Sequence, residues 1–283
     1  LPIIASFLDF IIVSLFIALF AVSFLLSRGE TPYDADDPQY NRTYWIERLS
    51  AHNPTTVYEA FKTKNAQTPF DHQHLAAHVF GELLFEHVGF HGVNVCDPTF
   101  GFGCFHGFFT RAVSGSGLSS VEALDEGCLE KYGPLGTGCQ HGIGHGIMEY
   151  LGYGEIEAAL EACDATTQVV PLLGCTSGVF MEYRKPLVIS SDTARVEPRP
   201  FDEADPYMPC LSVSDRFKSS CYFELGDWWR ATIGADYQKM GELCASAPTA
   251  YRKSCFLGLG AVAAPTEAFD IAQTLTRCEE EGY

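Results

Sequence analysis

The residues of this chain that could do chemistry are histidines and glutamates that recur at helical spacing. Two stripes of the form His-x3-His-x3-Glu occur. They consist of His74, His78 and Glu82 in the first stripe and of His141, His145 and Glu149 in the second. Residues at i, i+4 and i+8 lie on one face of a helix, where a histidine pair can bind a transition metal and a carboxylate can complete or orient the site. A single histidine is more often a core residue with a hydrogen-bond partner, but two matched stripes favour a metal site.

A further candidate ligand is His106, which occupies the same position in its repeat as His74 and His141. Imidazole and carboxylate ligands suit zinc, copper, iron or manganese, and we expect zinc or copper rather than iron or manganese. A glutamate of either stripe could also act as a base, so the sequence leaves open whether the protein is an enzyme. Because imidazole must be neutral to bind a metal, binding should weaken below about pH 6.5.

These histidines belong to a repeat of about 35 residues that is marked by cysteines. Each unit runs from an opening to a closing cysteine, and in the first unit His72 replaces the opening cysteine. The units comprise residues 72–96, 104–128, 139–163, 175–210, 221–244 and 255–278. A period of this length is typical of helical-hairpin arrays, so we expect two short helices in each unit. We expect an exposed loop at about 185–208, where one unit carries a proline-rich insertion.

Whether the two stripes form one site depends on how closely successive helices pack. At the usual spacing of about 8–10 Å, helices of the first and third units would lie about 20 Å apart. Gly142, Gly144 and Gly146 leave one side of the second stripe's helix almost bare, which permits a closer approach. We therefore expect a single site, with the imidazoles of His78 and His145 within about 8 Å of each other. Two independent sites are the alternative.

Ten of the eleven cysteines can pair within the repeat array. One register joins the closing cysteine of each unit to the opening cysteine of the next, and the other joins the two ends of each unit. The first register, which we favour, pairs Cys96 with Cys104, Cys128 with Cys139, Cys163 with Cys175, Cys210 with Cys221 and Cys244 with Cys255. Disulfides indicate an extracytoplasmic domain. The sequence has no Cys-x2-Cys pair, which argues against a cysteine-based zinc or iron–sulfur site and against covalently attached haem.

Three motifs of the repeat resemble a pattern in uncharacterised, secreted or membrane-anchored bacterial proteins. They are Cys104-Phe-His106-Gly, Cys139-Gln-His141-Gly-Ile-Gly-His145-Gly and Gly178-Val-Phe-Met-Glu182. The resemblance covers roughly residues 72–185. It implies a repeat domain in an extracytoplasmic setting, and it implies no particular activity.

The N-terminal segment, residues 1–27, is long and apolar enough to cross a bilayer as one helix. We expect a membrane anchor there, which other protein subunits contact, and the alternative is a helix in the core of a filament. Residues 28–70 should form a linker with short helices. Residues 71–283 should form the Cys-rich repeat domain, on the periplasmic or extracellular side of the membrane.

The chain is strongly acidic, with 36 Asp and Glu residues against 18 Lys and Arg and a formal charge of −18. Such a surface argues against nucleic acid as a partner. The sequence predicts an all-α fold in which an N-terminal transmembrane helix precedes a disulfide-stapled array of helical hairpins, similar to an α-solenoid. Two functions follow from these features: an extracytoplasmic metal-binding protein, or a non-catalytic scaffold or accessory subunit of a membrane complex or filament.

Overall fold

The computed structural model describes residues 33–34, 37–38, 41–167, 172–189 and 194–266. The chain divides into two units, Leu1–Tyr33 and Asp34–Tyr283, and nearly all described residues belong to the second. The expected transmembrane helix at 1–27 lies outside the described residues, as does Cys278, which the favoured register leaves without a partner. In the part of the chain that is described, no helix combines the length and apolarity needed to traverse a membrane.

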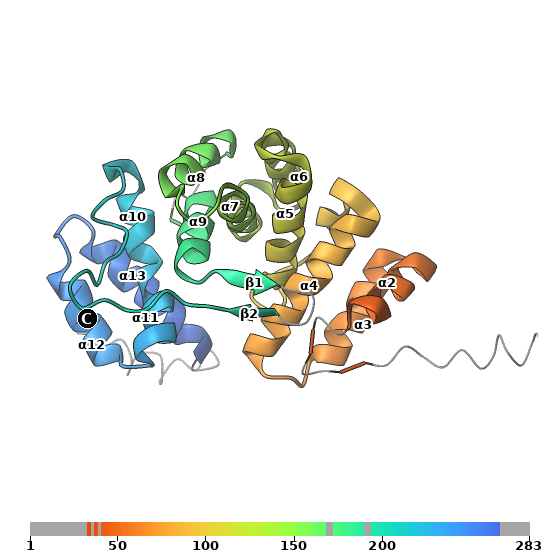
Figure 1. Ribbon diagram of the computed structural model, residues 1–283, viewed down its shortest axis with the longest axis horizontal. Helices are drawn as coiled ribbons and strands as arrows, with labels where there is room; N and C mark the ends of the chain where they lie inside the picture. Colours follow the sequence, from red (N-terminus) through yellow and green to blue (C-terminus); the bar gives the residue numbers. More distant parts are fainter. Residues whose placement is uncertain (1–32, 35–36, 39–40, 168–171, 190–193, 267–283) are drawn as a thin grey trace, which may run out of the picture. The chain divides into compact units, whose positions relative to one another are not determined.

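The described residues are almost entirely helical, as Figure 1 shows. The α-helices are α2 (Arg42–Ala51), α3 (Pro54–Asn65), α4 (Phe70–Val88), α5 (Gly103–Ser116), α6 (Val121–Tyr132), α7 (Thr137–Leu151), α8 (Ile156–Ala162), α9 (Cys175–Arg184), α10 (Asp215–Phe223), α11 (Leu225–Ile233), α12 (Tyr237–Ser246) and α13 (Arg252–Thr266). Short 3-10 helices are η1 (Gly89–Asn94), η2 (Leu118–Ser120), η3 (Gly133–Leu135) and η4 (Cys163–Ala165). The predicted helical fold is confirmed for these residues.

One departure from the predicted fold is a small antiparallel hairpin of β1 (Leu187–Ile189) and β2 (Ala194–Val196). It lies in the proline-rich insertion, where an exposed loop was predicted. The insertion also packs on the helices that follow it, because the indole of Trp228 donates to the carbonyl oxygen of Arg199 at 2.7 Å. The indole of Trp229 donates in the same way to Pro206 at 2.9 Å. The insertion therefore covers core residues, which its polar composition alone did not indicate.

Glycines in the left-handed region end several helices of the repeat. Gly117 follows α5 with φ +72°, Gly152 follows α7 with φ +89°, and Gly234 follows α11 with φ +79°. A residue with a Cβ is strained at such angles, so glycine is the residue that can end a helix in this way. Glycine in the sequence predicts helix breaks at 115–117, at 152 and 154, and at 234; the helices end before Gly117, Gly152 and Gly234, whereas Gly115 lies within α5.

The disulfides follow the junction register favoured from the sequence. Each bond joins the end of one unit to the start of the next, with Cα atoms 5.5 to 5.7 Å apart. The pairs are Cys96–Cys104, Cys128–Cys139, Cys163–Cys175, Cys210–Cys221 and Cys244–Cys255. All ten of these cysteines are buried. Each closed loop is short, so each bond should stabilise the fold by about 2–4 kcal/mol.

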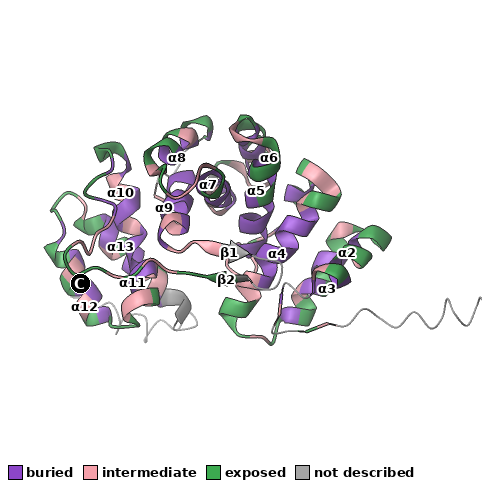
Figure 2. Cartoon of the chain, in the orientation of Figure 1, coloured by how far each residue is buried: buried purple, intermediate pink, exposed green. Residues whose placement is uncertain are grey.

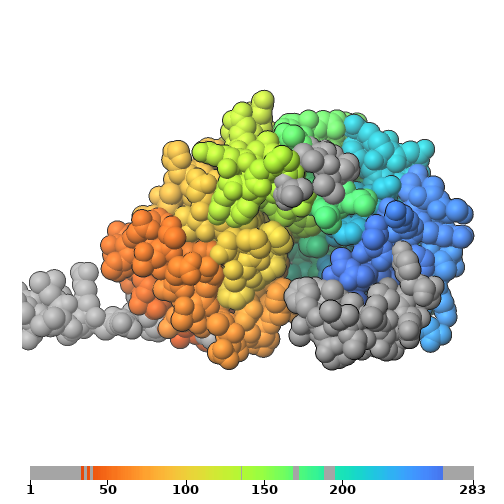
Figure 3. Space-filling view, turned by 180° about the vertical axis from the view of Figure 1, so that it is seen from behind, coloured from red at the N-terminus to blue at the C-terminus, as the bar shows by residue number. Residues whose placement is uncertain are grey.

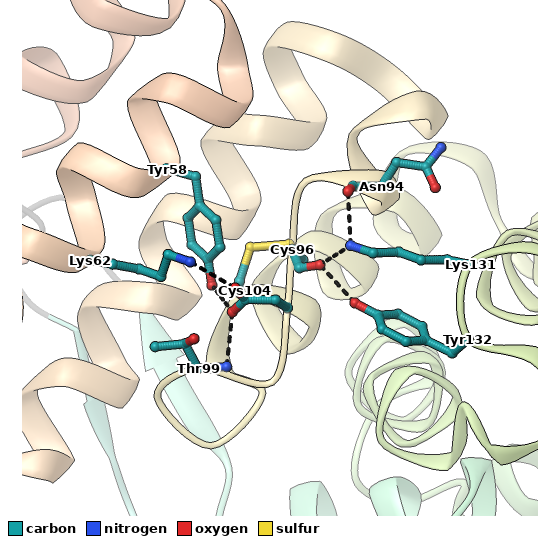
Figure 4. Close-up of a disulfide and its surroundings, with 9 residues drawn as sticks. Tyr58, Lys62, Asn94, Cys96, Thr99, Cys104, Lys131 and Tyr132 are labelled. Carbon is teal, nitrogen blue, oxygen red and sulfur yellow. Dashed lines mark hydrogen bonds and ion pairs between the residues drawn. A yellow bond between two sulfur atoms is a disulfide. The ribbon is translucent and has the colours of Figure 1, made fainter.

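Figure 4 shows how the loop around the Cys96–Cys104 disulfide is held between two helices. Side chains of α6 donate hydrogen bonds to the carbonyl oxygen of Cys96, and side chains of α3 donate to the carboxylate of Asp97. The donors are Lys131 and Tyr132 from α6 and Tyr58 and Lys62 from α3. This loop leads directly into α5 and fixes where that helix begins.

Helices α4, α5, α7 and α9 lie side by side and pack at their backbones (Figure 1). A Cβ added to Gly107 of α5 would lie 1.8 Å from the carbonyl oxygen of His78 in α4. At Gly178 of α9 it would lie 1.9 Å from the carbonyl oxygen of His141 in α7. No side chain larger than hydrogen fits at such distances, so the glycine three residues after the opening cysteine sets the helix spacing.

The three glycines of α7 lie on two sides of the helix, where they permit close contact with α5 and with α9. Cβ atoms on Gly142 and Gly146 would meet Phe105 and Phe109 of α5, whereas a Cβ on Gly144 would lie 2.0 Å from the carbonyl oxygen of Cys175 at the start of α9. Residues 142 and 146 are four apart and share a face, while residue 144 points to the other side of the helix. The predicted close approach is confirmed, and the glycines allow it on both sides of α7.

Helices α2 and α3 share a core with the repeat. The ring of Phe80 in α4 lies 4.6 Å from that of Phe61 in α3 and 5.7 Å from that of Trp45 in α2. Figure 2 shows the buried faces of α2, α3 and α4 turned toward one another. The expected short helices between residues 28 and 70 thus pack against the first repeat instead of forming a free linker.

Candidate metal centre

Five histidines from α4, α5 and α7 come together in one cluster. They are His74, His78, His106, His141 and His145. Possible ligand atoms of the first three lie within 4.8 Å of one another, as do those of the last three, so His106 belongs to both groups. The ring centroids of His78 and His145 are 6.3 Å apart, inside the limit predicted for a single site. The two stripes therefore converge, and α5 contributes the histidine that lies between them.

Two nitrogen–nitrogen distances in the first group suit ligands of a single metal ion. The Nε2 atom of His78 lies 3.1 Å from Nε2 of His74 and 3.1 Å from Nδ1 of His106. Two nitrogens that bind one tetrahedral zinc at about 2.0–2.1 Å are about 3.3 Å apart. These separations also suit a hydrogen bond between two rings, so the proton positions decide between the two interpretations.

Hydrogen bonds cannot account for both contacts of the first group. The Nδ1 atom of His74 lies 2.8 Å from the carbonyl oxygen of Phe100, which can only accept, so His74 carries its proton there and presents a lone pair at Nε2. The Nε2 atom of His78 has either one proton or one lone pair, yet it faces two ring nitrogens. One of the two contacts thus lacks a hydrogen bond, whereas a cation at the centre would be bound by all three lone pairs.

The hydrogen bonds of the second group, His106, His141 and His145, also indicate room for a cation. The Nδ1 atom of His145 lies 2.8 Å from a carboxylate oxygen of Glu182. The Nδ1 atom of His141 lies 2.6 Å from the hydroxyl of Ser177, whose own proton is donated to the carbonyl oxygen of Gly174. When Glu182 is ionised, both rings donate through Nδ1, and their Nε2 lone pairs face each other at 3.0 Å. Two lone pairs at this distance repel unless a cation lies between them.

Glu182 is a site residue that the search for ligands in the sequence did not select. Its carboxylate also accepts hydrogen bonds from the hydroxyl of Tyr153 at 2.7 Å and from the backbone N–H of Leu187 at 3.1 Å. Burial raises the pKa of Glu182 to about 7, and these donors partly offset the effect. A carboxylate that accepts from the far nitrogen of a histidine fixes its tautomer and orientation, as in many metal sites.

The loop before α5 is strained where it reaches the histidines. Phe100 and Phe102 have positive φ angles of 58° and 66°, and Gly101 between them has φ 62°. This left-handed run turns the carbonyl oxygen of Phe100 toward His74. Non-glycine residues seldom adopt such angles, and they concentrate at functional sites where the surroundings hold them in place. The disulfide and Asp97 provide that support here.

Burial keeps all five imidazoles in the neutral form. Desolvation lowers the pKa of each below the ordinary value of 6.5, and for His145 to about 3. Neutral imidazole is the form that binds a metal, so proton competition should begin at lower pH than the ordinary value predicts. The Nδ1 atom of His78 and the Nε2 atom of His106 are buried without a hydrogen-bond partner among the described residues.

The two glutamates of the stripes lie away from the ligand groups. Glu82 forms an ion pair with Arg42 of α2 at 2.7 Å, and burial raises its pKa. The side chain of Glu149 is hydrogen-bonded to Thr110, and desolvation of its carboxylate by the surrounding residues raises its pKa to about 7, with a further contribution from Glu182. Neither belongs to the groups of described residues that could share an ion. The role predicted for Glu82 and Glu149, as ligands or orienting partners, is filled at His145 by Glu182.

A pocket of about 440 Å³ opens beside the cluster. Its lining includes residues two positions after the start of five successive units. These are His74, His106, His141, Ser177 and Phe223. Figure 3 shows the surface hollowed between the yellow residues near 100 and the blue residues near 260. One repeat position therefore supplies candidate ligands in the first units and other pocket residues in the later ones.

Comparisons of the chain with protein-family models, with curated proteins and with solved structures find no match.

Proposed function

We propose that this protein binds a transition metal through the histidine cluster and performs its function outside the cytoplasm. The observation that carries the proposal is the 3.0 Å distance between the Nε2 atoms of His141 and His145, whose Nδ1 atoms face Ser177 and Glu182. Supporting observations are the triad of His74, His78 and His106 and the burial that keeps every ring neutral. The five buried disulfides support the extracytoplasmic location.

Zinc and copper are the metals that we propose first. The ligands are neutral nitrogen donors, and all ten described cysteines are bound in disulfides, so no thiolate competes at this site. Imidazole suits zinc, copper, iron and nickel, and the absence of a carboxylate from the two ligand groups makes a magnesium, calcium or manganese site unfavourable. Each group of three leaves a further coordination position, as catalytic zinc sites do.

The site holds either one or two ions, and His106 is a possible ligand in both cases. A single ion would use one triad, with the remaining histidines beside it. Two ions would require His106 to serve both groups, since it is the member that they share. In either case, loss of the His106 ring disrupts both groups at once.

Titration of metal-free protein with zinc, followed by calorimetry and elemental analysis, tests the proposal. We expect one or two equivalents to bind wild type with sub-micromolar affinity. We expect His106→Phe to weaken binding at least a hundredfold, because each triad loses one of three ligands. His91→Phe is the matched control, since His91 is exposed and lies outside both groups. Equal zinc binding by the two variants, or no binding by wild type, would refute the metal site and favour the alternative function as a scaffold.

A further inference from the structure

We propose that the pocket beside the histidine cluster binds a small organic carboxylate with an apolar body, and that the carboxylate reaches a bound metal ion. This inference rests on the proposed metal site and adds a ligand class to it. His74, His106 and His141 line the pocket, whereas His78 and His145 lie behind them and do not. The open coordination position of an ion held by either group can therefore face the pocket.

With a metal ion at the histidines, the charges of the pocket favour an anion. Lys185 and Arg230 both line it, and both contact the carboxylate of Asp227. The Nε atom of Arg230 is buried and has no hydrogen-bond partner in the described part of the chain. Asp71 also lines the pocket, so two carboxylates balance the two cations before any metal is counted. A divalent ion at the histidines would give the pocket a net positive charge, which attracts an anionic ligand.

A third acidic residue of the pocket, Glu224, does not cancel the charge of that ion. It is 6% exposed and lies beside Ser177, Arg184, Lys185 and Asp227. Burial, followed by the charge of Asp227, raises the pKa of Glu224 to about 8. At neutral pH it is mostly protonated, so it can donate a hydrogen bond to a ligand carboxylate instead of repelling it.

The apolar part of the ligand is inferred from the pocket mouth. Phe70 and Leu173 are large apolar residues that line the pocket and stay 55% and 42% exposed. Phe102 and Met181 extend the apolar wall inward. A cavity of about 440 Å³ with an apolar wall and a few convergent polar groups is typical of small-molecule sites. Benzoate combines the required carboxylate and apolar body and is a suitable probe.

The test is calorimetric titration of benzoate into zinc-loaded protein, with metal-free protein and the neutral isostere benzamide in parallel. We expect benzoate to bind the zinc-loaded form at least tenfold more tightly than the metal-free form, and benzamide to bind at least tenfold more weakly. Lys185→Met should weaken benzoate binding about tenfold, as loss of a charged hydrogen-bond partner does. Equal benzoate affinity with and without zinc would overturn the inference.

A pair of matched variants tests the position of the ligand. Leu173→Trp places a large ring at the pocket mouth, whereas Leu257→Trp makes the same change at a leucine that is 44% exposed and does not line the pocket. We expect benzoate binding to fall at least tenfold in the first variant only, with zinc binding unchanged in both. Loss in both variants, or in neither, would contradict the placement. A protein that binds zinc but not benzoate refutes this inference alone, whereas one that binds no zinc refutes the metal site itself.

Discussion

Replacement of Gly107 by alanine tests how the fold builds the histidine cluster. The added Cβ would lie 1.8 Å from the carbonyl oxygen of His78, whereas a carbon and a carbonyl oxygen in contact need about 3.3 Å. Helices α4 and α5 must then separate by about 1.5 Å, and the same movement would widen the 3.1 Å distance between Nε2 of His78 and Nδ1 of His106. Two nitrogens on one zinc at about 2.1 Å cannot lie more than about 4.2 Å apart, so the triad would fail or bind with distorted geometry.

Gly115→Ala is the matched control on the same helix. A Cβ at Gly115 would meet only Phe85, at an ordinary 3.8 Å. Both substitutions gain about 1 kcal/mol of helix propensity, which cancels when the two variants are compared. The remaining difference in unfolding free energy is the cost of overpacking, about 1–3 kcal/mol. Denaturant unfolding of metal-free protein measures this difference, and zinc titration should show at least tenfold weaker binding for Gly107→Ala alone. Two variants with the same stability and the same zinc affinity would refute the explanation.

Three other changes have defined outcomes. Glu182→Gln keeps the shape of the side chain but weakens the orientation of His145, so zinc affinity measured by chelator competition should fall about 10- to 100-fold; unchanged affinity would rule out an orienting role. Reduction and alkylation of the disulfides under mild denaturation, followed by refolding, should yield a protein less stable by about 2–4 kcal/mol for each bond lost, with full recovery as the contrary result. Glu224 has its folded-state pKa raised from 4.5 to about 8, so its contribution to stability is present at low pH and is lost as the pH rises through 8. The unfolding free energy of metal-free Glu224→Gln, relative to wild type, should therefore increase between pH 5 and pH 8, by up to about 4 kcal/mol, and a constant difference would contradict the assigned shift.

Much of this arrangement was predictable because cysteines and glycines mark the boundaries of the repeat units and of their helices. The cysteine spacing favoured the junction disulfides over the alternative register, and glycines in the sequence indicated where several helices end. His106 was identifiable from its repeat position although it lacks a histidine four residues later. The same offset would have identified Ser177, which stands where the earlier units have histidine and which accepts a hydrogen bond from His141.

Other parts of the site depend on contacts between distant residues, which spacing within one helix cannot show. Glu82 has the correct helical offset, but Arg42 lies across from it and forms an ion pair with its carboxylate. Glu182 has no place in either stripe, yet packing of α9 against α7 brings it to His145. The prediction for Glu82 relied on a local period, and the partner that changes its role lies 40 residues earlier in the chain.

X-ray absorption at the metal edge of zinc-loaded protein tests the central claim most directly. The histidine cluster predicts a first shell of three or more nitrogen atoms at about 2.0–2.1 Å, with the outer-shell scattering of imidazole rings and no sulfur at about 2.3 Å. His106→Phe should lose that imidazole signal, while His91→Phe should keep it. A first shell of oxygen alone, or a sulfur shell, in the wild-type protein would contradict the account.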